Sequence, residues 1–162
     1  MLIISPTARI SPLADIEDST RGTRIIVEDG AFIDAFVKIK PVAGTGDVRI
    51  GRNSYINSGN VIYSGNGVDI GEDVLVAANC TFAPVNHEFR SRSKKIIEQR
   101  FQPSRGGIVV EDDVWIGANC VILDGAILRK GCVIGAGSLV KGEIEAYSIN
   151  IGNPLRKMGS RE

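Results

Sequence analysis

The residue best suited to proton transfer is His87, the single histidine of the chain. An imidazole titrates close to neutral pH, so it can take a proton from a substrate as a general base. The alternative is a polar residue at the mouth of a loop. Glu88 and Glu98 follow closely in the sequence and are candidates for orienting the imidazole ring. One histidine cannot form a three-histidine zinc site, so we expect no catalytic metal.

The three cysteines and the single tryptophan suggest packing more than catalysis. The spacing of Cys80, Cys120 and Cys132 fits no zinc or redox motif, so we expect buried, reduced thiols. Trp115 lies next to an apolar residue that we expect to be buried, so its ring should face outward. An outward tryptophan indicates either a contact between subunits or a platform for an apolar part of a ligand.

The segment 88–109 is strongly basic, although the whole chain has 19 basic and 19 acidic residues. Its net charge is +4, because Arg90, Arg92, Lys94, Lys95, Arg100 and Arg105 stand against Glu88 and Glu98. Such a segment is either a solvated loop or a region that attracts a phosphate-bearing ligand. The neutral balance of the whole chain argues against a general nucleic-acid binder.

The composition indicates which elements must position these residues. A length of 162 residues suits one domain, which we place at residues 1–162. The chain contains 22 Ile and 15 Val against 7 Leu, and β-branched residues favour strands, so we expect an all-β fold. No apolar run is long enough to span a bilayer, and the first residues lack the basic start of a signal peptide. We therefore expect a soluble, cytoplasmic protein without membrane insertion.

An aliphatic or phenylalanine residue recurs every six positions through most of the chain. These lead residues are Ile4, Ile10, Ile16, Val27, Ile33, Ile39, Ile50, Ile56, Ile62, Ile70, Val76, Phe82, Val110, Ile116, Ile122, Leu128, Ile134 and Val140. In the C-terminal half a mostly small residue stands four positions after each lead, at Val114, Cys120, Ala126, Cys132, Ser138 and Ile144. A period of six fits a short strand and a tight turn, with three such units closing one coil. The pattern predicts a triangular β-solenoid of about six coils, with the lead residues stacked inside it.

Each break in the six-residue pattern falls after three repeats, which is one full coil. Short insertions lie near residues 22–26, 45–49 and 68–69, and the long insertion is the segment 88–109. All extra residues therefore leave the prism at the same edge, where we expect a functional loop. After Ile144 the pattern ends in a terminal strand and a tail at about 155–162.

The stretch VEDDVWIGANCVILDGAILRKGCVIGAGSLV, followed by INIGNPLRK, resembles the hexapeptide-repeat acyltransferases. It is most similar to the group of galactoside, maltose, xenobiotic and polysaccharide O-acetyltransferases, and the resemblance covers nearly the whole chain from Ile50. It implies a left-handed parallel β-helix and a homotrimer with active sites between subunits. It also implies direct transfer of an acetyl group from acetyl-CoA to a hydroxyl or amine.

The same resemblance implies roles for seven residues. His87 would be the general base, and Asn57 would bind the acceptor. Contacts to acetyl-CoA would come from Trp115, Ala118, Ala136, Lys141 and Arg156. Lys141-Gly142 stands where many members have Thr-Lys, so we expect the lysine contact to be shifted or absent.

Three functions stay open at the level of the sequence. The first is acetylation of a hydroxyl of a saccharide or polysaccharide precursor. The second is N-acetylation of an amino sugar linked to a nucleotide, whose phosphates the basic segment would suit. The third is a non-catalytic solenoid used for assembly. The long loop is several residues longer than that of the sugar acetyltransferases, so we expect a different acceptor pocket, with a saccharide hydroxyl as the first choice of acceptor.

Overall fold

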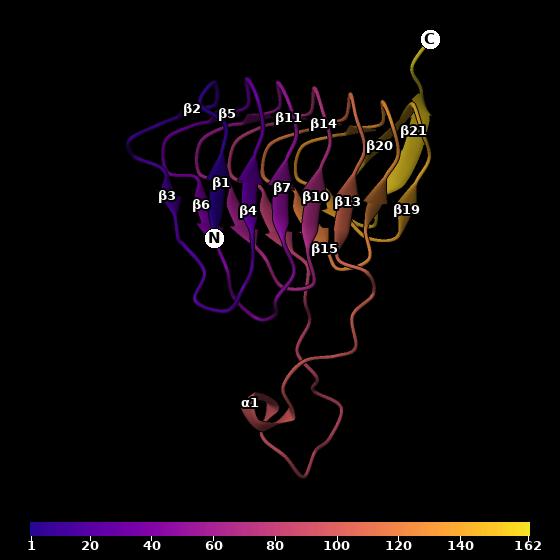
Figure 1. Cartoon of the computed structure of the whole chain (residues 1–162). Coiled ribbons are helices and arrows are strands. Elements are labelled where there is room, and N and C mark those ends of the chain that lie inside the picture. The colour runs from indigo at the N-terminus through magenta and orange to yellow at the C-terminus, as the bar shows by residue number, and fades with distance from the viewer.

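The computed structural model describes residues 1–162 and has the fold of a left-handed parallel β-helix. In each coil the chain passes through three parallel sheets in turn, which we name sheets A, B and C. The sheets form the three sides of a prism, and one long loop projects from it (Figure 1). The expected solenoid is confirmed, with six complete coils and a partial seventh.

The three sheets contain 21 strands, which follow one another in each sheet from the N-terminal end of the prism. Sheet A contains β1 (Leu2–Ile4), β4 (Ile25–Val27), β7 (Val48–Ile50), β10 (Val68–Ile70), β13 (Ile108–Val110), β16 (Ile127–Leu128) and β19 (Glu143–Ile144). Sheet B contains β2 (Arg9–Ile10), β5 (Phe32–Ile33), β8 (Tyr55–Ile56), β11 (Leu75–Val76), β14 (Trp115–Ile116), β17 (Val133–Ile134), β20 (Ser148–Ile151) and β21 (Arg156–Ser160). Sheet C contains β3 (Asp15–Ile16), β6 (Lys38–Lys40), β9 (Val61–Tyr63), β12 (Thr81–Ala83), β15 (Val121–Leu123) and β18 (Leu139–Val140). The single helix, α1 (Ile96–Gln99), has four residues, and no helix is long and apolar enough to cross a membrane.

The lead residues stack in register, as the six-residue period predicts. In sheet A, for example, Ile50 pairs with Ile70, and Ile70 pairs with Val110. Twenty-eight buried hydrophobic residues form one continuous core inside the prism. Each coil buries its apolar row only against the coils on either side, so the core extends along the axis from the second coil, at Ile25, to Ile144 in the last.

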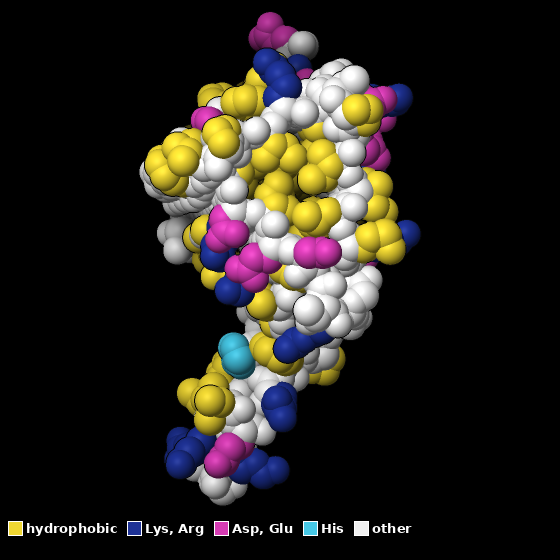
Figure 2. Space-filling model, turned by 60° about the vertical axis from the view of Figure 1, so that its left-hand side comes forward, with side chains coloured by type: hydrophobic (Ala, Val, Ile, Leu, Met, Phe, Trp, Pro, Cys, Tyr) yellow, Lys and Arg dark blue, Asp and Glu magenta, His cyan; other side chains and the backbone are white.

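The first coil forms an open end of this core. Ile4 is 41 % exposed, and Ile10 and Ile16 are only partly buried, because no coil lies beneath them. Figure 2 shows this end of the prism with hydrophobic side chains visible inside the ring. The period alone therefore overstates burial in the first coil.

The C-terminal coil differs from the prediction in two respects. Ile144, expected at the position of a small residue, pairs with Leu128 and occupies the lead row of sheet A. The reason is a short turn at 141–142, which brings Ile144 into the lead row four residues after Val140 instead of six. Most of the predicted tail forms β21, which pairs antiparallel with β20.

The insertions do leave the prism at one edge, which we name the C/A edge because the chain there passes from sheet C to sheet A. They occupy residues 17–24, 41–47, 64–67 and 84–107. The three short ones end before the predicted segments do, because residues 25–26, 48–49 and 68–69 already pair within sheet A. The opposite turns, at 57–60, 77–80, 117–120 and 135–138, form the B/C edge.

Candidate functional site

The long loop has a paired neck that positions His87. His87 and Phe101 form an antiparallel bridge at the base of the loop. Two backbone hydrogen bonds flank it, Glu88 N to Arg100 O at 3.0 Å and Gln102 N to Asn86 O at 2.8 Å. Gly107, with φ of +77°, closes the loop so tightly that a Cβ would meet Gly67 O at 2.5 Å. The loop therefore has a fixed base, from which its tip projects (Figure 1).

The imidazole of His87 is exposed and lies against one aromatic ring. The centroids of His87 and Phe101 are 4.7 Å apart, and their planes are inclined by 38°. No hydrogen bond to the imidazole forms within the chain. Figure 2 shows the histidine, in cyan, at the junction of the loop and the prism.

Neither candidate carboxylate orients His87. Glu88 instead accepts hydrogen bonds from the backbone N–H groups of Arg90 at 3.0 Å and Phe89 at 2.8 Å. These bonds lower the pKa of Glu88 from its ordinary value, with the Arg90 N–H contributing most. Glu98 accepts a hydrogen bond from Lys95 N at 3.2 Å, at the start of α1. Both side chains stabilise local turns of the loop, and the neighbouring Phe101, which the sequence pattern did not single out, is the residue that contacts the imidazole.

A second group of predicted residues lies at the B/C edge and on the adjoining face of sheet B. Trp115 is 51 % exposed and stands between Leu75 and Val133 on the outer face of sheet B, so its predicted outward orientation is confirmed. Ala118 and Ala136 occupy the same turn position in consecutive coils, where Ala118 O accepts from Gly137 N at 2.8 Å. The backbone N–H groups of Ala118 and Ala136 form no hydrogen bond within the chain. This edge therefore presents free donors beside an exposed indole.

Asn57 lies at the same edge, in the third coil. Its Nδ2 donates to Val76 O at 2.7 Å, which leaves its carbonyl oxygen Oδ1 free. The turn of Asn57 is held by Asn60, a fully buried residue whose Nδ2 donates to Asn57 O at 2.5 Å and Ala77 O at 2.9 Å. Asn60 Oδ1 accepts in turn from Cys80 N at 3.0 Å. Asn60 was not among the predicted residues, although an amide in a column of small buried residues is a signal in the sequence that could have found it.

The two remaining predicted residues lie apart from the B/C edge. Lys141 is exposed at the C/A edge, directly after β18. Arg156 is exposed in β21, where it pairs with Ile151. The predicted residues thus form one group at the C/A edge, with His87 and Lys141, and another at the B/C edge, with Asn57, Ala118 and Ala136. One chain does not bring the two groups together, because sheet C separates these edges.

All three cysteines are free and buried, as predicted. Burial raises the pKa of the Cys132 thiol to about 12. A thiol with such a pKa is almost entirely protonated at neutral pH, so Cys132 is not a nucleophile in the folded chain.

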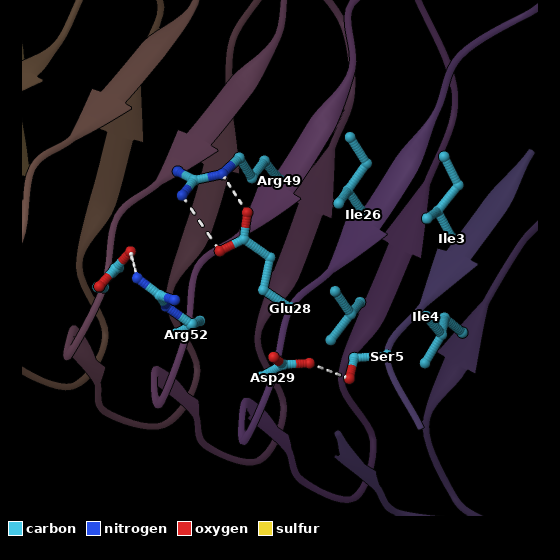
Figure 3. Close-up of a pocket in the computed structure, with 10 residues that line it drawn as sticks. Ile3, Ile4, Ser5, Ile26, Glu28, Asp29, Arg49 and Arg52 are labelled. Atoms are coloured by element: carbon cyan, nitrogen blue, oxygen red, sulfur yellow. Dashed lines mark hydrogen bonds and ion pairs between the residues drawn. The ribbon is translucent and has the colours of Figure 1, made fainter. Parts of the chain in front are cut away.

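A cavity of about 490 Å³ lies on the outer face of sheet A and contains none of the predicted site residues (Figure 3). Its charged side chains are already paired. Arg49 bonds Glu28 at 2.7 Å and Asp69 at 2.8 Å, and Arg52 bonds Glu72 at 2.8 Å. These pairs link neighbouring coils, and the hydrogen bonds of Arg49 to Glu28 and, to a lesser extent, to Asp69 raise the pKa of Arg49. We assign this cavity to the structural ladder of sheet A.

Two families of repeats match the chain. The family described as "Bacterial transferase hexapeptide (six repeats)" matches residues 107–142. The family described as "Hexapeptide repeat of succinyl-transferase" matches residues 46–81. Together they cover coils on both sides of the long loop, including Trp115, Ala118, Ala136 and Asn57.

Three curated relatives share a substantial part of the chain. Galactoside O-acetyltransferase of Escherichia coli is 34 % identical over 110 residues, which is 68 % of this chain and 52 % of the relative. A probable acetyltransferase of Mycobacterium tuberculosis is 30 % identical over 120 residues, 74 % of this chain and 39 % of the relative. A putative lipopolysaccharide biosynthesis O-acetyl transferase of E. coli is 29 % identical over 132 residues, 78 % of this chain and 64 % of the relative. The chain thus spans less than two thirds of the length of each.

Two solved structures share the fold. A hexapeptide-repeat-containing acetyltransferase from Vibrio cholerae, complexed with acetyl-CoA, is 28 % identical with a TM-score of 0.71 and covers 85 % of this chain and 71 % of its own. AntD, an N-acyltransferase from Bacillus cereus in complex with dTDP and 3-hydroxybutyryl-CoA, is 21 % identical with a TM-score of 0.79. It covers 97 % of this chain and 81 % of its own, and its similarity concerns the fold.

Proposed function

Because this chain belongs to the hexapeptide-repeat acyltransferases, we propose that it transfers an acetyl group from acetyl-CoA to a hydroxyl of a saccharide or polysaccharide precursor. The observation that carries the proposal is the position of His87. The only histidine of the chain has an exposed imidazole, held at the rigid neck of the one long loop. A general base must be reachable by the acceptor and must keep its geometry, and this location meets both needs.

In this mechanism His87 takes the proton of the acceptor hydroxyl as its oxygen attacks the thioester carbonyl carbon. A C–O bond forms, the C–S bond breaks, and the imidazolium returns its proton to the leaving thiolate. Holding donor and acceptor in one cleft makes the attack effectively unimolecular. No acyl-enzyme is needed, in keeping with the buried state of all three thiols.

The B/C edge fits the acyl donor. The free N–H groups of Ala118 and Ala136 can donate to the amide carbonyls of the pantetheine arm, and the exposed ring of Trp115 can cover its apolar part. Asn57 offers a free carbonyl oxygen, which can accept a hydrogen bond from an acceptor hydroxyl. Arg156 is the basic residue that we assign to the CoA phosphates, and Lys141 lines a separate cavity at the base of the long loop.

A complete site requires a second copy of the chain. His87 stands at the C/A edge, and Asn57, Ala118 and Ala136 stand at the B/C edge, so we propose that neighbouring copies each supply one group. Such a contact is heterologous and closes into a ring, and we propose a homotrimer. The outer face of sheet B suits such a contact, because the partly or well exposed side chains of Phe32, Tyr55, Leu75, Trp115, Val133 and Ile149 form one column on it.

The test is a screen for CoA release from acetyl-CoA with free sugars, oligosaccharides and nucleotide-linked amino sugars as acceptors. We expect release with a free sugar or oligosaccharide. Release only with nucleotide-linked amino sugars would favour N-acetylation, the alternative that the net charge of +4 in the segment 88–109 supports. Absence of release with every acceptor would contradict the proposal. Light scattering should give three times the chain mass of 17.3 kDa.

A further inference from the structure

Most basic side chains of the prism are paired with carboxylates, and the scattered exceptions are Arg9, Arg21, Lys130 and Arg156. Eight basic side chains form ion pairs, namely Arg24, Lys38, Lys40, Arg49, Arg52, Arg129, Lys157 and Arg161. Most of these pairs join one coil to the next and so support the solenoid. The neighbouring carboxylates therefore neutralise the positive charges of these eight side chains.

The basic residues around the base of the long loop differ. Arg105 and Lys141 form no ion pair, and Arg90 approaches Glu88 no closer than 3.9 Å. These three cations line one cavity of about 280 Å³, together with the amide side chains of Asn86 and Gln102. Two cations without a carboxylate partner and a third with only a distant one, converging on a cavity, create a positive potential there.

The cavity is built on a fixed framework. Asp124 is 4 % exposed, and its carboxylate accepts hydrogen bonds from Arg105 N at 2.9 Å and Gly107 N at 3.0 Å. The backbone that carries the Arg105 side chain is thereby tied to the turn after β15. Asp124 is the single acidic residue that lines the cavity, against three cations. Its carboxylate is already bonded to backbone N–H groups, and the cavity keeps an excess of positive charge.

We propose that this cavity is a subsite for a phosphate or diphosphate group of a substrate, held by Arg90, Arg105 and Lys141. Guanidinium groups bind phosphate oxygens in a bidentate manner, an ammonium adds a point charge, and the two amides add neutral donors. The inference deepens the proposed function, on which it rests for the identity of the substrate. The phosphate belongs either to the acyl donor or to the acceptor.

The position of the cavity relative to His87 separates binding from chemistry. Side chains alternate along the paired neck, so Asn86 and Gln102 face away from His87 and Phe101. The subsite therefore lies beside the base without containing it. A phosphate bound there would anchor a substrate whose reacting group lies elsewhere.

Direct binding tests the subsite without turnover. The probe is inorganic pyrophosphate, titrated calorimetrically into the wild-type protein and into Arg105→Gln/Lys141→Gln. The control, Arg92→Gln/Lys94→Gln, removes the same charge from loop residues that do not line the cavity. We expect binding to weaken at least tenfold in the first variant and less than twofold in the control. Equal weakening in both variants, or no binding by the wild-type protein, would overturn the subsite.

Kinetics then distinguish the two sources of the phosphate. One arm compares KM for acetyl-CoA with KM for S-acetylpantetheine. The other arm compares KM for a nucleotide-linked sugar with KM for the same free sugar. In the double variant the ratio of the two KM values, which measures the preference for the phosphorylated form, should fall at least tenfold in one arm only. If the protein is active and the double variant keeps its preference for the phosphorylated form in both arms, the inference is contradicted. Should no acceptor be acetylated, the proposed function fails, and the pyrophosphate titration alone decides the subsite.

Discussion

The imidazole of His87 and the phenyl ring of Phe101 lie 4.7 Å apart across the neck of the long loop. The Phe101 ring packs against the imidazole, and no carboxylate forms a hydrogen bond to it. The orientation of the proposed base thus depends on aromatic packing and on the paired backbone of the neck.

Replacement of Phe101 by Ala should lower kcat about tenfold or more, because a loosened ring spends less time in the reactive geometry. KM for acetyl-CoA should stay nearly constant, because the pantetheine contacts lie at the other edge. The measurement is steady-state kinetics of CoA release. Phe101→Tyr keeps the ring and should retain most of the activity. Equal kcat of the Ala variant and the wild type would show that Phe101 does not orient His87.

Replacement of Trp115 by Ala should raise KM for acetyl-CoA more than KM for the acceptor. The indole is 51 % exposed and should cover the pantetheine arm, a contact present in both ground and transition states. Leu75→Ala changes an exposed neighbour in the same column and serves as the control. A larger change in the acceptor KM would mean that donor and acceptor are placed the wrong way round.

The thiols should be silent in the native protein. Burial raises the pKa of Cys132 to about 12, whereas the hydrogen bond with Cys80 lowers the pKa of Cys120. All three side chains are fully buried, so an aromatic disulfide reagent cannot reach them and should label none of them on the time scale of an assay. Unfolding in denaturant should expose three thiols per chain. Rapid labelling that abolishes activity would instead point to a covalent route.

Acid should weaken one link between coils. Asp47 accepts hydrogen bonds from Arg24 Nε at 2.8 Å and Arg24 N at 2.7 Å, and the Arg24 side chain is the main cause of the lowered pKa of Asp47. Because the pKa of Asp47 is lower in the folded chain than its ordinary value near 3.8, the ionised carboxylate stabilises the fold at pH values above 3.8. This contribution is lost as the pH falls through the folded-state pKa. Asp47→Asn should therefore unfold at a lower temperature than wild type at pH 6, with a smaller gap at a pH well below the ordinary pKa of 3.8. A gap that is the same at both pH values would show that the Asp47 charge does not stabilise the fold.

The sequence predicted the prism because burial in a solenoid repeats with the coil. Ile50, Ile70 and Val110 needed no tertiary information to be placed in one row. The period failed at the two ends, where neighbours are missing or the turn is shorter. Ile4 is exposed for the first reason, and Ile144 shifts into the lead row for the second.

The candidate site was less predictable, because it depends on hydrogen bonds rather than on periodicity. The roles of Asn60 and Asp124 follow from backbone groups that the fold brings to them from other turns. Sequence proximity suggested Glu88 and Glu98 as partners of His87, but backbone N–H groups within the loop already occupy both carboxylates. The position of His87 and Asn57 at different edges of the prism could also be seen only from the geometry of the coils.

The most direct test of the central claim is kcat for acetyl transfer by His87→Asn, measured with melting temperature and molar mass on the same sample. As the general base, His87 should contribute about 10²–10⁴ in rate, so kcat should fall by that factor. The wild-type profile of kcat/KM against pH should show an acid limb, because a protonated imidazole cannot accept a proton, and the variant should lose it. The exposed position of His87 outside the core predicts an unchanged melting temperature and molar mass. A folded variant with wild-type kcat, or a loss of activity that accompanies unfolding, would contradict the account.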